Sequence, residues 1–245
     1  MPPGCAEWEW PEEDCEYWES PEEAGSEWES EEGEEEWPTE EGSPEEEEEA
    51  GHDPILFVRG IFANKNSFKT MIGRFKADGW AASRLHDWAY NWAQSNVTTA
   101  GRVSEKVNEL LKVTGATKVD IVTHSMGGLS SRYFLKNIAG AQEKVDEWVS
   151  LGGPNHGTNW AFACVLTSCI QMRPNSTFLN ELNAGDETPG EVNYGTWRSP
   201  GDAVVSVTSV PLAGALINEL TANMSHGALH EDKTVYEEVR EFVKF

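Results

Sequence analysis

The stretch from residue 118 to residue 140 constrains the fold of this chain most, because it combines a strand, a tight turn and a helix without interruption. The run KVDIVT is apolar enough to be buried on both faces, as strands of parallel sheets are. Beyond the turn, apolar residues recur at helical spacing, namely Leu129, Tyr133, Phe134 and Ile138. A strand that passes directly into a helix is typical of a sheet flanked by helices.

The turn itself, THSMGG at residues 123–128, places Ser125 at the carboxyl end of the strand. Such a turn forces a serine into strained backbone geometry that exposes its hydroxyl, and the two glycines leave room for strand and helix to pass closely. The helix that begins at Met126 directs its N–H groups to the same point. We therefore predict a catalytic nucleophile at Ser125. The alternative is an ordinary serine in a glycine-containing turn, since Thr123 replaces the first Gly of the G-x-S-x-G pattern.

The rest of residues 51–245 follows the same pattern of short apolar runs between helical segments, which predicts an α/β fold with a mainly parallel sheet flanked by helices. Strands are expected at 55–58, 84–90, 118–123, 145–151 and 191–197, and helices at 66–79, 98–115 and 232–243. The length suits one compact domain. The segment 154–190 is too short for a large lid domain.

Residues 1–50 differ in kind from the remainder, because they hold 23 of the 43 acidic residues and none of the 18 Lys and Arg. Such like-charge density with few aliphatic residues predicts a disordered, solvated tail. Its five Trp residues suggest an alternative, in which they dock on a basic partner or on the apolar groove of the folded domain. The rest of the chain is nearly neutral, so no basic patch is offered to nucleic acid.

The four cysteines form two close pairs, Cys5 with Cys15 and Cys164 with Cys169. Neither spacing supplies the four ligands of a structural zinc, and we expect no metal and no cofactor. A disulfide between Cys164 and Cys169 is preferred to two buried thiols and would imply an oxidising compartment. No apolar run approaches the roughly 18 residues of a membrane-spanning helix. We expect a secreted protein, although this sequence has no signal peptide at its start.

Five segments together resemble the small bacterial lipases of the lipase class 2 family, which are related to the compact lipases of bacilli and to actinobacterial triacylglycerol lipases. They are ILFVRGIF, VDIVTHSMGGLSSRYFLKN, WVSLGGPNHGT, SPGD and SHGALHEDKTVYEEVREFV. The resemblance covers nearly all of residues 53–245 and none of the tail. It implies an α/β-hydrolase fold and hydrolysis of triacylglycerols or other carboxylic esters through an acyl-enzyme. We expect a monomer that makes transient contact with a lipid interface.

In α/β-hydrolases the nucleophile is followed along the chain by the acid and then by the histidine. This order restricts the base to His156, His226 or His230. His156 follows too closely to leave space for an intervening acid strand. His226 lies in a turn before the last helix, where the family places its base, whereas His230 is interpreted as an exposed polar residue at the helix start. We therefore predict His226 as the base.

The acid is predicted to be Asp202, which follows the expected strand EVNYGTW and matches the family's acid position. The rivals Asp186 and Glu187 lie in a polar loop, and Asp232 is better explained as a charge at a helix N-terminus. The predicted triad is Ser125, Asp202 and His226.

The oxyanion hole is predicted to use the backbone N–H groups of Met126 and of Ile61, in the loop after the first strand. Most lipases of this type have His-Gly in that loop, where this chain has Arg59 and Gly60. Backbone donors do not need the His side chain, but an Arg would put a fixed charge close to the site. The alternatives are a carboxylesterase of short acyl chains, a thioesterase, or a catalytically silent α/β-hydrolase that acts as a binding module.

Apolar residues between 154 and 190 would either line an acyl-binding groove or belong to the core. They are Trp160, Phe162, Val165, Leu166 and Phe178.

Overall fold

The computed structural model describes residues 52–62 and 66–244. Its centre is a six-stranded sheet of order β2-β1-β3-β4-β5-β6, in which every neighbouring pair is parallel. The strands are β1 Ile55–Val58, β2 Leu85–Asp87, β3 Val119–His124, β4 Val145–Leu151, β5 Asn193–Arg198 and β6 Ile217–Leu220. The expectations for the acidic tail and for Cys5 and Cys15 concern residues outside the described ranges and stay predictions.

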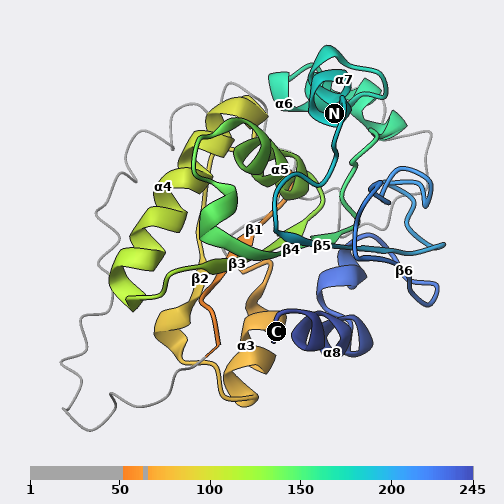
Figure 1. The fold of residues 1–245 in the computed structure, drawn as a ribbon. Helices are drawn as coiled ribbons and strands as arrows, with labels where there is room; N and C mark the ends of the chain where they lie inside the picture. The colour runs from red at the N-terminus through yellow and green to blue at the C-terminus, as the bar shows by residue number, and fades with distance from the viewer. Residues whose placement is uncertain (1–51, 63–65, 245) are drawn as a thin grey trace, which may run out of the picture. The chain divides into compact units, whose positions relative to one another are not determined.

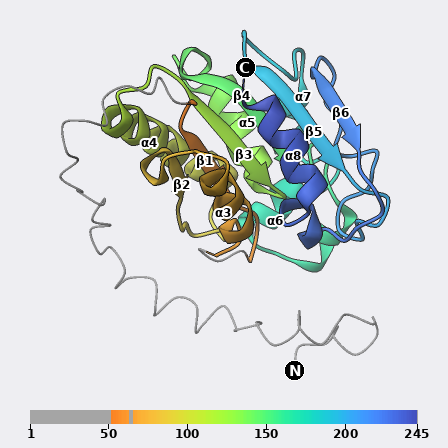
Figure 2. The same cartoon turned by 90° about the horizontal axis from the view of Figure 1, so that it is seen from below.

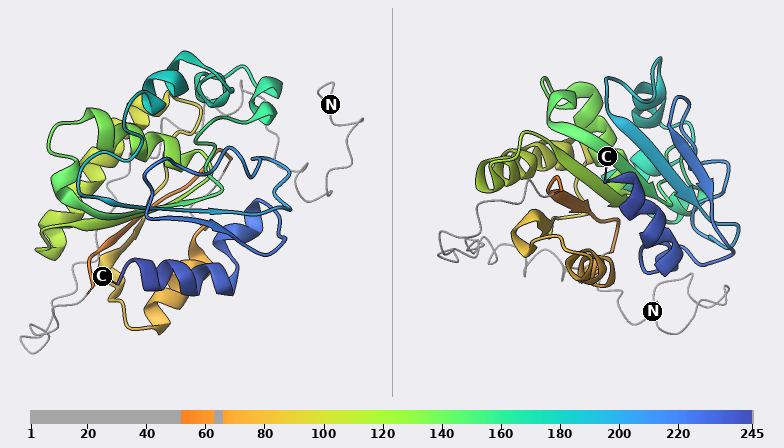
Figure 3. Two further views of the ribbon diagram at one scale, coloured as in Figure 1. Left: turned by 45° about the vertical axis from the view of Figure 1, so that its right-hand side comes forward. Right: turned by 60° about the horizontal axis from the view of Figure 1, so that its bottom comes forward.

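Helices cover both faces of the sheet (Figure 1). Helices α4 (Asn96–Thr114) and α5 (Gly127–Asn137) lie on one face, and α3 (Lys69–Ala77) and α8 (Lys233–Phe242) on the other, as the left view in Figure 3 also shows. Figure 2, seen from below, brings α3 and α8 in front of the strands. The predicted α/β fold with a mainly parallel sheet is confirmed.

Strands in the middle of the sheet are buried on both faces, because each face carries its own hydrophobic core. Along β1, Leu56 and Val58 belong to the core under α4 and α5, whereas Ile55 and Phe57 belong to the core under α3 and α8. This alternation follows from the two-residue period of a strand. All six residues of β3 are likewise buried, as the run KVDIVT predicted.

Local signals explain where the longest helix begins and ends. The Ser95 side chain accepts a hydrogen bond from the Val97 N–H at the start of α4, and Gly115 ends the helix in the left-handed conformation, with φ of 69°. Val103 and Val107 lie one turn apart on the face that packs against the sheet. The other predicted helices also form, within a few residues of their expected bounds.

The edge strand β6 and the helices of the segment after β4 were not predicted. The edge strand β6 has no residue that is fully buried, so its sequence INEL carries no apolar pattern. The short helices α6 (Thr167–Met172) and α7 (Thr177–Asn183), with η3 (Asn159–Ala163), make up the segment after β4, and no large lid is formed there. None of the helices in the described ranges is both long and apolar enough to cross a membrane.

Candidate active site

Ser125 occupies the turn between β3 and α5, at the carboxyl end of the sheet. Its φ of 55° lies in the left-handed region, which is uncommon for any residue other than glycine. The Ser125 N–H donates to the Leu151 carbonyl at the end of β4, with a distance of 2.9 Å, and holds the turn against the sheet. A strained serine stabilised by its surroundings is typical of functional sites.

Two glycines allow the loop after β1 to lie against this turn. A Cβ on Gly60 would be 2.6 Å from Ser125 Cβ, and one on Gly127 would be 2.2 Å from the Val58 carbonyl oxygen. Any larger residue would therefore push the loop and the turn apart. The contact brings the loop that carries Ile61 beside the turn that carries Met126, the two predicted oxyanion donors, and both side chains pack in one apolar cluster.

Thr123 fits in place of the first glycine of the motif because its hydroxyl finds a partner in the sheet. It donates to the Val149 carbonyl of β4, at 2.8 Å. A Cβ on Gly128 would be 3.3 Å from the same hydroxyl oxygen, so the start of α5 leaves just enough space for a threonine.

Asp202 and His226 form a hydrogen-bonded pair: His226 Nδ1 lies 2.7 Å from Asp202 Oδ2. The other carboxylate oxygen accepts the N–H groups of Val204 and Val205, both at 2.8 Å, and the Asp202 side chain is only 1% exposed. A carboxylate oxygen can only accept here, so Nδ1 carries the proton and Nε2 has its lone pair available.

His226 Nε2 is buried and has no hydrogen-bond partner within the described part of the chain, so Ser125 Oγ is not bonded to it in this structure. Catalytic hydrogen bonds are often long in unliganded enzymes and tighten when substrate binds. The structure thus pairs Asp202 with His226, two of the three predicted triad members, and does not bond Ser125 to them.

Residues missed in the sequence analysis surround the proposed acid and base. A Cβ on Gly152, at φ of 60°, would come within 3.2 Å of both Asp202 Oδ2 and His226 Cε1. The Ser199 hydroxyl bonds to the Met224 carbonyl at 2.7 Å and to the Met224 N–H at 2.8 Å, which links the acid loop to the loop before His226. The only sequence signals were the glycine pair after β4 and the SPGD segment.

Two further histidines, His124 and His230, are packed near His226. The ring centroid of His124 is 4.6 Å from that of His226 and 4.4 Å from that of His230. The expectation that His230 is an exposed residue at a helix start is wrong: it is 9% exposed and its ring also meets Phe68. The sequence analysis failed here because the packing partners come from β3 and from the segment before α3.

Burial and the charge of His226 lower the pKa of His230 to about 4, and burial lowers the pKa of His86 to a similar value. Unfolded histidines titrate near pH 6.5, so between pH 6.5 and 4 the unfolded chain binds more protons than the folded one, and stability falls as pH falls. His230 alone should account for about 3 kcal/mol at pH 4. We expect thermal unfolding followed by circular dichroism to show a smaller acid destabilisation in His230→Phe. An unchanged pH dependence in that variant would contradict the assignment.

The rival acids have other roles. Asp232 caps α8, where it accepts from the N–H groups of Thr234 and Val235, as predicted. Glu187 lies 3.0 Å from His156 Nε2, and Asp186 accepts the Thr188 N–H. Neither reaches His226.

Arg59 is buried and its charge is paired. Its Nε donates to Asp87 Oδ1 at 3.1 Å, a second nitrogen of the guanidinium contacts the same carboxylate oxygen, and its side chain is 2% exposed. The Tyr90 hydroxyl donates to the Arg59 carbonyl and anchors the loop before Ile61. The carboxylate compensates the charge that Arg59 introduces beside the site.

An apolar surface formed by Phe62, Trp92 and Trp160 lies beside the turn that carries Ser125. The ring centroid of Phe62 lies 4.5 Å from that of Trp92 and 5.9 Å from that of Trp160, and Phe62 is 44% exposed. Both tryptophans pack on the same buried cluster as Met126. This aromatic surface therefore continues from the turn of Ser125 to the outside of the molecule.

The predicted groove residues fall into two groups. Phe178 is buried, and Trp160 and Leu166 are partly buried against the cluster around Met126, whereas Phe162 and Val165 are exposed. The predicted disulfide between Cys164 and Cys169 is present and closes the loop that carries Val165.

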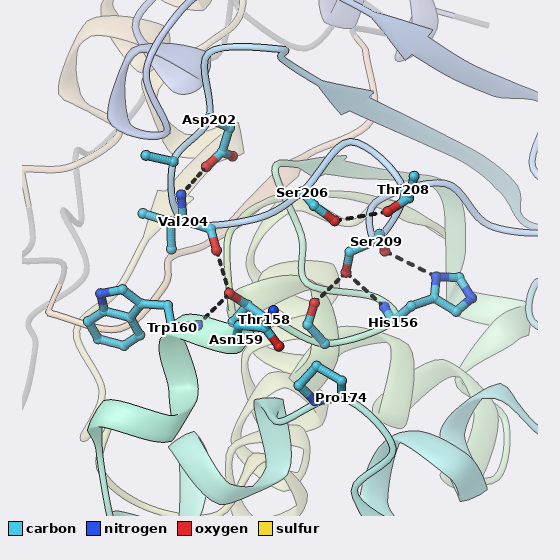
Figure 4. Close-up of a pocket in the computed structure, with 12 residues that line it drawn as sticks. His156, Thr158, Asn159, Trp160, Pro174, Asp202, Val204, Ser206, Thr208 and Ser209 are labelled. Atoms are coloured by element: carbon cyan, nitrogen blue, oxygen red, sulfur yellow. Dashed lines mark hydrogen bonds between the residues drawn. The ribbon is translucent and has the colours of Figure 1, made fainter.

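A pocket of about 330 Å³ lies beside Asp202 (Figure 4). Its lining includes Asp202, His156 and several hydroxyl side chains, but neither Ser125 nor His226. The hydroxyls are already engaged: Ser209 Oγ donates to the Gly157 carbonyl at 2.6 Å, and Thr158 donates to the Val204 carbonyl. The pocket therefore adjoins the proposed acid, but the proposed nucleophile and base do not line it.

In the described ranges, no group of three or more His, Cys, Asp or Glu side chains is placed to hold a metal ion.

Comparison with known families gives a match over most of the chain. The family model described as lipase (class 2) matches residues 52–239. The chain is 28% identical over 110 residues to a triacylglycerol lipase of Pseudomonas fragi, covering 44% of this chain and 36% of that enzyme. It is 42% identical over 55 residues to a triacylglycerol lipase of Pseudarthrobacter phenanthrenivorans, covering 22% and 16%. The chain thus spans only a minor part of the length of these curated relatives.

Solved structures agree on the fold. The mature form of the Bacillus licheniformis lipase BlEst2 superposes with a TM-score of 0.68 at 15% identity, covering 83% of this chain and 97% of that one. Aspergillus fumigatus lipase B gives a TM-score of 0.61 at 16% identity, covering 76% and 51%.

Proposed function

The chain belongs to the class 2 lipase family, and on this premise we propose that it hydrolyses carboxylic esters of lipids through Ser125, His226 and Asp202. One observation carries the proposal. The Asp202 carboxylate fixes the proton of His226 on Nδ1 and leaves Nε2 without a partner among the described residues. His226 and the strained Ser125 both lie in loops that follow the carboxyl ends of the parallel strands. A base with an available lone pair and an oriented ring is what a serine hydroxyl requires for activation.

The proposed reaction has two steps. Ser125 Oγ attacks the acyl carbon while His226 Nε2 takes the hydroxyl proton, and the Asp202 carboxylate stabilises the resulting imidazolium. The oxyanion of the tetrahedral intermediate accepts the backbone N–H groups of Met126 and Ile61. Protonated His226 then gives its proton to the leaving alcohol, an acyl-enzyme forms, and water hydrolyses it in the reverse sense.

The aromatic surface of Phe62, Trp92 and Trp160 suits an acyl chain and a transient contact with a lipid interface. It is apolar, partly exposed, and continuous with the cluster that contains Met126. Apolar area gains roughly 25 cal/mol for each Å² removed from water, so longer acyl chains should bind better. We infer triacylglycerols or other esters of medium-length acyl chains as substrates, and the Cys164–Cys169 disulfide supports action outside the cell.

Hydrolysis of p-nitrophenyl esters from acetate to palmitate tests the proposal. We expect kcat/KM to be highest for medium or long chains. In Phe62→Ser it should fall about fivefold for the octanoate, because roughly 1 kcal/mol of apolar contact is lost, and stay within about twofold for the acetate. Leu216→Ser, at another exposed apolar position, is the matched control and should leave both rates unchanged.

A preference for acetate or butyrate would identify an esterase of short acyl chains instead. Failure to hydrolyse any ester or thioester, together with no covalent labelling by a fluorophosphonate, would favour a silent hydrolase that acts as a binding module. A preference for acyl thioesters would favour a thioesterase.

A further inference from the structure

We propose that His124 is a positioning residue, which holds the main chain of His226 so that the imidazole of His226 stays aligned with Ser125. The proposal rests on the proposed function, because it matters only if His226 is the base. His124 directly precedes Ser125, so the same turn of the chain would position both the nucleophile and the residue that holds His226.

The strand β3 decides where His124 points. Side chains alternate between the two faces of a strand. Ile121 belongs to the core under α4 and α5, and Thr123 lies beside Gly128 at the start of α5. Val122 belongs to the opposite core, and His124 shares its face. The imidazole of His124 is thereby directed towards the segment that carries His226 and His230.

His124 Nε2 lies 3.0 Å from the carbonyl oxygen of His226. A carbonyl oxygen can only accept, so Nε2 of His124 carries a proton and donates it. This bond acts on the main chain of His226, while Asp202 acts on its ring. The main chain of His226 is therefore held from the end of β3, and its imidazole from the loop after β5.

The surroundings keep this donor in one state. His124 is 7% exposed, and its ring contacts the rings of both His226 and His230. Burial, and then the charges of His230 and His226, hold the pKa of His124 well below its usual range. A neutral His124 donates from Nε2 without placing a positive charge beside the imidazolium that forms on His226 during catalysis.

A role in packing alone would require only a flat ring at this place, whereas positioning requires the donor. His124→Phe keeps the ring and removes the donor, so the His226 carbonyl loses this hydrogen bond. His124→Gln keeps an N–H at the position of Nε2. Val239→Ala, in the buried face of α8 and away from the site, is a control for general loss of stability.

We expect His124→Phe to lower kcat for p-nitrophenyl octanoate roughly tenfold to a hundredfold with KM within about twofold, and His124→Gln to recover most of the loss. Val239→Ala should lower the melting temperature and leave kcat unchanged. In proton NMR, the downfield resonance of the His226 Nδ1–H bonded to Asp202 should weaken or shift in His124→Phe and persist in His124→Gln.

Native kcat in His124→Phe would overturn the inference, as would an equal loss of kcat in Val239→Ala. Equal losses in the Phe and Gln variants, with both proteins folded, would also overturn it. Retention of activity in Ser125→Ala would instead overturn the proposed function, so the two failures can be told apart.

Discussion

Ser125→Ala should abolish ester hydrolysis and lower kcat by roughly a millionfold, the size of effect that follows when the nucleophile of a serine hydrolase is removed. The residual rate would come from the proposed oxyanion donors, the N–H groups of Met126 and Ile61, and from substrate binding. Alanine keeps a Cβ at φ of 55°, so the turn and its bond to the Leu151 carbonyl should persist, and the melting temperature should change little.

The measurement is hydrolysis of p-nitrophenyl octanoate together with labelling by a fluorophosphonate, which reports the nucleophile independently of turnover. Ser206→Ala is a suitable control, because that exposed hydroxyl pairs with Thr208 in the loop after Asp202. We expect the control to retain native activity and labelling. More than a few per cent of native activity in Ser125→Ala, or labelling at another residue, would exclude Ser125 as the nucleophile.

Asp202→Asn should lower kcat about ten-thousandfold, and the hydrogen bonds of Asp202 give the reason. The N–H groups of Val204 and Val205 point at Oδ1, so the amide oxygen of Asn must take that place. The amide NH2 would then face His226 Nδ1 and donate to it. The imidazole would have to carry its proton on Nε2, where it blocks removal of the serine proton.

The same assay compares this variant with Asp186→Asn and Glu187→Gln, the two rival acids, which should stay within about twofold of native kcat. Their carboxylates contact Thr188 and His156 and do not contact His226. A loss in either rival that exceeds the loss in Asp202→Asn would place the acid elsewhere and would contradict the proposed triad.

The elements around the nucleophile were predictable because their signals are local. The strands at 55–58 and 145–151 have the expected bounds. Their signal, an apolar run followed by a glycine or a polar turn, is contained in a few neighbouring residues. The turn at Ser125 could be identified in the same way. Edge strand β6 could not, because its residues are mostly exposed and need no apolar pattern.

In the candidate site, too, some residues could be predicted from the sequence and some contacts could not. Asp202 and His226 could be proposed from chain order and from the family resemblance, but their hydrogen bond joins residues 24 positions apart in two separate loops. The link that Ser199 makes between those loops, and the space that Gly152 leaves beside them, were marked only by the SPGD segment and the glycine pair after β4. His230 was predicted to be exposed, and its burial depends on a ring from β3.

Sequence alone was enough for the α/β class, the strand and helix at Ser125 and the pairing of Cys164 with Cys169, because each depends on periodicity, turn chemistry or short separation. Only the tertiary structure decided that Asp87 pairs with Arg59, and that His124 donates to the main chain of His226. Those partners are 28 and 102 residues apart. Burial and hydrogen-bond partners at such separations are set by how strands and loops assemble in space, and no local pattern encodes them.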